Sequence, residues 1–339
     1  MRLIERVWFY RHPAKYLLVP LLLPLSLLFW LLSSLRKALF LLGIKASVKL
    51  SCPVVIVGNI GVGGNGKTPL VLFLVEQLTK QGIKVGVISR GYGGQAPYYP
   101  YLLDSKTSAE QAGDEPVLIY QRTKVPVVVA SDRVAAAKQL IELGCQLIMS
   151  DDGMQHYRLQ RDYELLVVDG KRQFGNGLLL PAGPLRESCN RLNSVNRIII
   201  NGEQPLSYPN KTAQHHMLLT AERLINVKTG EQLVLADFIQ QFPQVNAMAG
   251  IGDPARFFNY LVELGFILDK SQGFIDHQAY NKSMLTALAQ QNEILLMTEK
   301  DAVKCTEFAQ KNWWYLPVDA SFSASDKRTI LTDIVRLIA

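Results

Sequence analysis

The feature that most constrains the fold of this chain is a glycine-rich loop between a short apolar run and a helix-like segment. The run Pro53–Gly58, PVVIVG, is β-branched and bounded by proline and glycine, which predicts a buried parallel strand. It leads into Gly61–Thr68, GVGGNGKT, a full match to G-x-x-x-x-G-K-[ST]. Residues 69–80 then carry apolar side chains at helical spacing. Strand, glycine loop and helix in this order predict a P-loop unit.

The residue types of this loop match the chemistry of phosphate binding. Glycines let backbone N–H groups turn towards phosphate oxygens, and the start of the following helix adds its dipole. Lys67 reaches the β- and γ-phosphate oxygens, and Thr68 holds Mg²⁺. We therefore expect ATP and Mg²⁺ as cofactors. The residues expected to bind the nucleotide are Gly61, Gly63, Gly64, Asn65, Gly66, Lys67 and Thr68.

An acidic pair provides a candidate metal site. The run Gln146–Ser150 predicts a strand, and Asp151 and Asp152 follow it directly. Ligands of α/β sheets bind at the carboxyl ends of the strands, and adjacent carboxylates repel each other unless a cation is present. A solvated turn is the alternative, because Asp-Gly is a common turn dipeptide. We expect Thr68, Asp151 and Asp152 to hold the metal, and the sequence leaves open which aspartate touches it.

Strand-like and helix-like segments alternate along the rest of the chain, which predicts an α/β fold with a P-loop NTPase-like doubly wound parallel sheet. The pattern loosens near residue 202, and a second series follows. We expect an N-terminal membrane anchor helix over 1–45, a P-loop core domain over 46–205 and a smaller α/β domain over 206–339 that closes the cleft. The expected strands are 85–89, 125–130, 147–150, 165–169, 197–200, 245–249 and 294–297, with helices over 133–143, 254–264 and 326–338.

The first 50 residues carry all the excess positive charge. The chain has a net charge of +7, and eight Lys/Arg but one acid lie in residues 1–50, so the remainder is formally neutral. Leu17–Leu35 is uncharged, and nineteen helical residues just cross about 30 Å of hydrocarbon. Arg36-Lys37 follow where a signal peptide needs small residues for cleavage. Eleven leucines and two prolines without a polar stripe argue against a buried core helix.

These observations favour a membrane anchor, and a membrane rather than nucleic acid as the partner. Pro20 and Pro24 leave open whether the helix spans the bilayer or lies in its interface. The four cysteines are scattered without a CxxC pair, which indicates reduced thiols in the cytosol rather than a zinc site or disulfide framework.

Eight short strings follow the apolar segment in an order and spacing that resemble one family, the tetraacyldisaccharide 4′-kinases, also called lipid A 4′-kinases. The resemblance covers essentially the whole chain. Any one string alone is weak, but together they are specific. The strings are VGNIGVGGNGKTP (57–69), SRGYGG (89–94), GDEP (113–116), SDDGMQH (150–156), PAGPLRE (181–187), GIGDPARFF (250–258), FIDHQAY (274–280) and TEKDAVK (298–304).

The resemblance implies transfer of the ATP γ-phosphoryl group to the 4′-hydroxyl of a tetraacylated glucosamine disaccharide 1-phosphate, in lipid A biosynthesis. It implies an anionic glycolipid substrate, no nucleic acid and no protein partner. It also implies a location at the bacterial inner membrane with the active site on the cytoplasmic face. A lipid substrate agrees with the anchor, and an anionic substrate agrees with the basic residues beside it.

The resemblance also implies roles for individual residues. Asp114 would be the catalytic base, His277 its partner, and Lys67 a catalytic cation. Arg90 would contact phosphate or substrate, and Arg186 and Glu187 would contact the substrate or a metal. Three of these residues have a structural alternative: Asp114 fits a helix N-cap, His277 a structural loop residue, and Arg90 a surface arginine in a glycine turn. Glu299-Lys300-Asp301 fit a helix start as well as a position near the nucleotide. We expect His215-His216 on the surface and Trp313–Tyr315 in a core.

Two other functions use the same loop. A switch or motor NTPase would carry a lysine where this chain has Val62, and a guanine-binding [NT]-K-x-D element is missing because Thr298–Asp301 has another order. A non-catalytic membrane scaffold would leave the acidic pair and the candidate base without a task. The three functions differ in whether phosphate ends on lipid, on water or nowhere.

Overall fold

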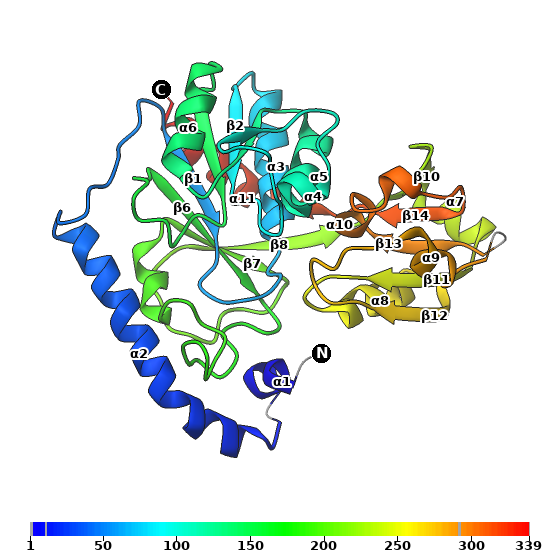
Figure 1. Ribbon diagram of the computed structural model, residues 1–339, viewed down its shortest axis with the longest axis horizontal. Helices are drawn as coiled ribbons and strands as arrows, with labels where there is room; N and C mark the ends of the chain where they lie inside the picture. The colour runs from blue at the N-terminus through cyan, green and yellow to red at the C-terminus, as the bar shows by residue number, and fades with distance from the viewer. Residues whose placement is uncertain (1–2, 11, 291–292, 339) are drawn as a thin grey trace.

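The structure is a computed structural model, which describes residues 3–10, 12–290 and 293–338. Two sheets with their covering helices form two domains side by side, and a long helix runs along one side of the first domain (Figure 1). The nine-stranded sheet has the order β15-β8-β7-β6-β1-β5-β2-β4-β3, and the six-stranded sheet has the order β10-β9-β14-β13-β11-β12.

The large sheet confirms the predicted doubly wound parallel fold. Seven strands are parallel, and the two at its edges, β3 and β15, are antiparallel to their neighbours. Its strands are β1 (Val54–Gly58), β2 (Val85–Ser89), β3 (Tyr101–Leu102), β4 (Val127–Val129), β5 (Leu147–Asp151), β6 (Tyr163–Asp169), β7 (Arg197–Asn201), β8 (Gln214–Thr220) and β15 (Asp319–Ser321).

Helices cover both faces of this sheet, which explains why the central strands carry apolar side chains on both faces. Every residue of β1, β2, β5 and β6 is buried. One face packs against α3 (Lys67–Lys80), α5 (Asp114–Thr123) and α11 (Ala324–Val335). The other packs against α6 (Arg133–Glu142). The short helices α4 (Ala109–Ala112) and Cys189–Ser194 complete this domain.

The small domain packs its own two apolar layers. Trp314 and Phe238 belong to the layer on one side of the sheet, and Trp313 belongs to the layer on the other, so the predicted core position of the tryptophan pair is confirmed. Its strands are β9 (Arg223–Asn226), β10 (Gln232–Val234), β11 (Gln244–Ala249), β12 (Ile267–Gly273), β13 (Leu295–Thr298) and β14 (Trp313–Leu316). Its helices are α7 (Leu235–Gln241), α8 (Pro254–Glu263), α9 (Lys282–Thr286), α10 (Glu299–Ala302) and Thr306–Phe308.

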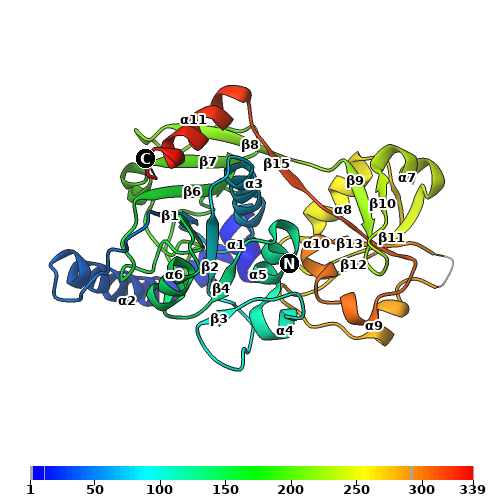
Figure 2. The same cartoon turned by 90° about the horizontal axis from the view of Figure 1, so that it is seen from above.

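The predicted domain boundary at residue 206 is wrong. Strand β8 lies in the large sheet beside β7, and β15 pairs with β8. Helix α11 lies against the large sheet (Figure 2), and its Ile330 and Ile334 belong to the core of the large domain. The small domain is therefore an insertion over 221–318, and the chain returns to the first domain at its end.

One histidine of β8 also corrects an expectation. His215 is buried, and its Nδ1 lies 2.7 Å from the carboxylate of Asp326 in α11. His215 was expected on the surface, but alternate residues of β8 are buried beneath α11. His216 is only half-buried and contacts the carbonyl oxygen of Gly202.

The N-terminus forms α1 (Leu3–Phe9) and α2 (Lys15–Leu41). Helix α2 has 27 residues, is longer than the predicted Leu17–Leu35 and continues through Pro20 and Pro24. It is long and apolar enough to cross a membrane, and most of its leucines are exposed. Ser26 is its one buried residue. This helix thus presents an apolar surface to its surroundings while one polar side chain faces the large domain.

Candidate active site

The P-loop connects β1 to α3, and its backbone requires glycine at two positions. Gly63 has φ 104° and Gly66 has φ 94°, both in the left-handed region that glycine tolerates. A Cβ atom on Gly66 would lie 2.6 Å from Nδ2 of Asn201, which donates a hydrogen bond to the Asn65 carbonyl oxygen at 3.2 Å. Lys67 is the first residue of α3. The loop therefore wraps the helix N-terminus, the geometry that binds phosphate.

Asp151 is a buried carboxylate without a hydrogen-bond partner in the described part of the chain. It ends β5, beside β1, and is 1% exposed. Neither of its oxygens has a hydrogen-bond partner among the described residues. Burial and the negative charge of Glu115 raise its pKa to about 7, against the opposing effect of Lys67. An unpaired buried carboxylate at this edge of the sheet is the group that a hard cation would satisfy, so these residues fit a Mg²⁺ ion.

Asp152, in contrast, is paired with the guanidinium group of Arg186. Its two oxygens accept hydrogen bonds from Arg186 at 2.9 Å and 3.1 Å, and its backbone adopts φ 49°. Burial opposes ionisation of this carboxyl, but Lys67 and Arg186 together lower its pKa below the ordinary value. The two adjacent aspartates therefore have different environments, and Asp151 is the one without a compensating hydrogen bond.

The three expected substrate residues occupy different environments. The guanidinium group of Arg186 already donates hydrogen bonds to Asp152 and to the side chain of Asn59. Glu187 accepts hydrogen bonds from Gln155 at 2.7 Å and Tyr157 at 3.2 Å. Arg90 follows β2, is exposed and lines the cleft. Arg90 is thus the freest of the three to meet a ligand, whereas Glu187 shapes the cleft wall.

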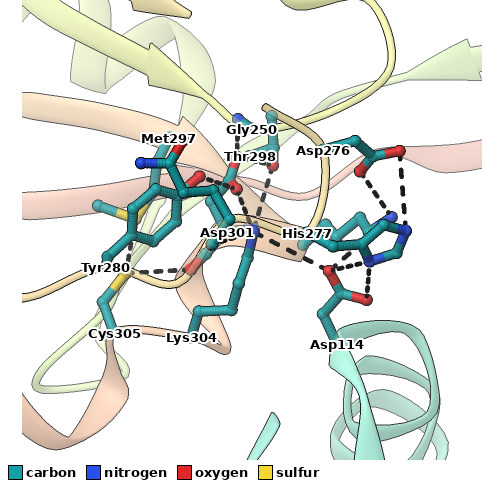
Figure 3. Close-up of polar contacts among 12 residues, drawn as sticks. Asp114, Gly250, Asp276, His277, Tyr280, Met297, Thr298, Asp301, Lys304 and Cys305 are labelled. Atoms are coloured by element: carbon teal, nitrogen blue, oxygen red, sulfur yellow. Dashed lines mark hydrogen bonds and ion pairs between the residues drawn. The ribbon is translucent and has the colours of Figure 1, made fainter. Parts of the chain in front are cut away.

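Asp114 and His277 meet across the two domains (Figure 3). Asp114 is the first residue of α5 and is 4% exposed, with Gly113 rather than Asp114 at the N-cap. His277 lies in the loop between β12 and α9, with φ 63°. Its Nδ1 is 3.0 Å and 3.1 Å from the two oxygens of Asp114. The sequence placed these residues in one site only through the family resemblance, and the structure brings them into contact.

Charge determines the protonation of this pair. Burial disfavours the Asp114 carboxylate, but the hydrogen bond from His277 and the charges of Lys300 and Lys304 lower its pKa below the ordinary value. The same hydrogen bond raises the pKa of His277, against burial and the repulsion of Lys300. Asp114 is therefore ionised at neutral pH, the form that accepts a proton.

Sequence reasoning missed the cation that holds the acidic groups together. Lys300 of α10 lies 3.1 Å from Glu115, 3.2 Å from Asp276 and 3.8 Å from Asp114. Burial lowers its pKa, but these carboxylates raise it further, so the net shift is upward. The TEKDAVK string contains Lys300, but in the sequence alone a helix start explained this residue equally well. The structure supports both descriptions, because Thr298 also caps α10 by accepting from the Asp301 amide.

A cleft of about 2830 Å³ joins these groups. The P-loop, Asp151, Arg90 and His277 line it. Its wall also includes Phe29, Leu32 and Arg36 of α2. The site therefore lies between the two domains and reaches the long apolar helix.

Contacts that the sequence did not predict surround the P-loop, one from within the large domain and one from the small domain. Arg172 donates to the Gly64 carbonyl oxygen at 3.3 Å. A Cβ atom on Gly252 of the small domain would lie 3.4 Å from the Gly64 nitrogen. Beside them, Arg256 of α8 donates to Asp169 at the end of β6 at 2.6 Å. The GIGD loop therefore contacts the phosphate-binding loop directly.

Comparison with known proteins gives a consistent result. The family model described as tetraacyldisaccharide-1-P 4′-kinase matches residues 18–336. The tetraacyldisaccharide 4′-kinase of Colwellia psychrerythraea is 58% identical over 337 residues, covering 98% of this chain and 96% of that protein. The enzyme of the same name from Vibrio vulnificus is 50% identical over 336 residues, covering 99% and 98%.

A solved structure is similar over the same length. The crystal structure of LpxK from Aquifex aeolicus in complex with ATP superimposes with a TM-score of 0.80 at 29% identity, covering 95% of this chain and 100% of that one. This structural match extends over both domains of the chain. This chain belongs to the tetraacyldisaccharide-1-P 4′-kinase family.

Proposed function

We propose that this chain transfers the γ-phosphoryl group of ATP to the 4′-hydroxyl of a tetraacylated glucosamine disaccharide 1-phosphate, the lipid A precursor. The observation that carries the proposal is the contact of a buried Asp114 with His277, which lines the same cleft as the P-loop. A switch NTPase does not need a buried carboxylate–histidine pair at this cleft, whereas a kinase needs a group that takes the proton of the acceptor hydroxyl.

Each residue has one task in this reaction. The P-loop backbone and Lys67 hold the β- and γ-phosphates at the start of α3. Asp114 accepts the proton of the attacking hydroxyl, and His277 orients the carboxylate through Nδ1. Arg90 is free on the cleft wall to meet the anionic substrate. Closing the two domains around the site excludes water, which favours transfer to sugar over hydrolysis.

Thr68 and Asp151 are the residues that would hold Mg²⁺, because Asp151 is buried and has no hydrogen-bond partner among the residues that the structure describes, while Asp152 is paired with Arg186. When bound, the metal neutralises the charge of the transferring phosphate. Asp152 would then hold Arg186 next to Asp151 and would not coordinate the ion itself. This assignment distinguishes the two aspartates, which the sequence left open.

Helix α2 supports a lipid substrate at the inner membrane, with the cleft on the cytoplasmic face. Its exposed surface is apolar, and Phe29, Leu32 and Arg36 reach the cleft wall. An apolar helix that borders a phosphate-transfer cleft lets acyl chains stay in the bilayer while the sugar enters the site. Arg36 adds a positive charge at the entrance, which suits an anionic headgroup.

The test is phosphate transfer from γ-labelled ATP with Mg²⁺ and the disaccharide 1-phosphate lipid in detergent micelles. Wild type, Asp114→Ala and Asp269→Ala are compared, since Asp269 is an exposed aspartate of β12 and serves as the matched control. We expect label in the lipid with wild type and the control, and loss of it with Asp114→Ala. Label found only as free phosphate, unaffected by lipid, would refute the kinase and favour a switch NTPase.

A further inference from the structure

Asp301 is a buried carboxylate whose task is not explained by the reaction itself. It is 0% exposed, lies in the first turn of α10 and does not line the cleft. Its oxygens contact Gly250 N at 2.9 Å, Tyr280 Oη at 2.8 Å, Thr298 Oγ1 at 2.6 Å and Lys304 Nζ at 2.9 Å (Figure 3). Capping of α10 requires only the Thr298 side chain. Four donors on one carboxylate therefore indicate a further role.

These donors come from separate segments that all lead to the active site. Gly250 begins the 250–253 loop, whose Gly252 lies beside Gly64 of the P-loop. Tyr280 ends the 274–280 loop, which carries His277. Lys304 lies 3.9 Å from Asp114. A single side chain thus connects the loop at the phosphate site, the loop with the histidine and a cation beside the base.

The packing around Asp301 leaves little room for adjustment. A Cβ atom on Gly250 would lie 2.0 Å from Tyr280 Oη and 2.9 Å from Asp301 Oδ1, so the loop backbone rests directly on this pair. The Lys304 ammonium lies 4.6 Å from the centre of the Tyr280 ring. Burial and the charge of Asp301 raise the pKa of Tyr280, so the phenol remains a donor. The cluster is therefore a tightly packed, buried hydrogen-bond network rather than a solvated ion pair.

We propose that Asp301 is a positioning residue that sets the distance between the phosphate-binding loop and the Asp114–His277 pair. Its carboxylate keeps the 250–253 and 274–280 loops in one arrangement, so that His277 reaches Asp114 when the P-loop holds ATP. Misplacement of a reacting group by about 1 Å costs roughly 10²-fold in rate. Loss of Asp301 should therefore act on turnover rather than on nucleotide affinity.

The experiment compares Asp301→Asn with Asp333→Asn in the full-length protein. Asn keeps the shape but replaces an acceptor by an amide N–H that faces other donors. Asp333 is the matched control, because it also pairs with a tyrosine and a cation, Tyr163 at 2.7 Å and Arg197 at 2.7 Å, but on the large sheet. We expect Asp301→Asn to lower kcat by about 10- to 100-fold with a nearly unchanged KM for ATP. The control should retain kcat.

A double-mutant cycle separates positioning from general loss of structure. If Asp301 acts through His277, then Asp301→Asn combined with His277→Ala costs little more than His277→Ala alone. Tyr280→Phe removes one donor and should lower kcat less than Asp301→Asn, again non-additively with His277→Ala. This variant also carries the test if Asp301→Asn does not fold.

Three results would overturn the inference: wild-type kcat in Asp301→Asn, additive losses in the cycle, or an equal loss in Asp333→Asn. The inference rests on the proposed kinase activity, and the two fail in different ways. An inactive wild type refutes the function, whereas an active wild type with an unaffected Asp301→Asn variant refutes only the role of Asp301.

Discussion

Ser26→Ala should weaken the docking of the long N-terminal helix on the large domain. Ser26 Oγ accepts a hydrogen bond from the Ala182 amide at 2.9 Å and donates one to the Leu179 carbonyl oxygen at 3.0 Å. Leu179 keeps a second donor, the amide of Gly183 at 2.9 Å, so alanine leaves only the Ala182 N–H unpaired. An unpaired buried donor costs about 1–3 kcal/mol, which corresponds to roughly a 5- to 150-fold shift in the docking equilibrium.

Hydrogen exchange at the Ala182 amide measures this shift directly. We expect exchange to accelerate by the same factor, roughly 5- to 150-fold, and the KM for micellar lipid to rise while the KM for ATP stays nearly constant. Ser34→Ala is the matched control, because Ser34 lies on the same helix but is exposed. Unchanged exchange and lipid KM in Ser26→Ala would refute the view that this serine fixes α2 against the cleft.

Three further variants test other parts of the structure. The pKa of His277 is raised in the folded protein, so this residue stabilises the fold fully below the ordinary histidine pKa near 6.5 and loses this contribution as the pH rises through the raised pKa. The loss of unfolding free energy in His277→Asn, measured by denaturant titration, should therefore be largest below about pH 6. A loss that grows with pH would contradict this prediction. Arg122→Met leaves the buried Glu299 without the cation 3.1 Å away and should cost about 3–5 kcal/mol of unfolding free energy by chemical denaturation, with a loss below 1 kcal/mol counting against a structural ion pair. Asp151→Asn should abolish the increase in Tm that Mg²⁺ adds to the ATP-bound protein while keeping the increase from ATP alone, and a preserved Mg²⁺ effect would remove Asp151 from the metal site.

The local part of the site could be predicted from the sequence. A strand, a glycine loop and a helix are neighbours in the chain, and their residue pattern determines their backbone, so β1, the P-loop and α3 are where the sequence predicted them. The place of Asp151 and Asp152 at the end of a strand followed from the local pattern, but only the structure shows that Asp152 is paired and Asp151 is not, among the described residues. The roles assigned to Asp151, Asp114 and His277 remain predictions until they are tested.

Contacts between distant segments could not be derived from local pattern. Asp114 and His277 are 163 residues apart, and nothing in the periodicity of either segment selects the other as a partner. Lys300 has the residue type of an ordinary helix start, and only its three carboxylate neighbours reveal a further function. Strand β15 is three residues long, too short to give a periodic signal, so the return of the chain to the large sheet was missed.

That return has a consequence for how the protein is built. The small domain leaves the large sheet after Thr220 and rejoins it at Asp319, and these two residues are paired neighbours on antiparallel strands. Its two ends are therefore adjacent, as they must be for an autonomous unit placed within another domain. A short turn joining Thr220 to Asp319 would close the P-loop domain without residues 221–318. Such a shortened chain would keep the nucleotide loop and Asp114 but lose His277, Lys300 and Asp301, so nucleotide binding and phosphoryl transfer would become separable properties of one polypeptide.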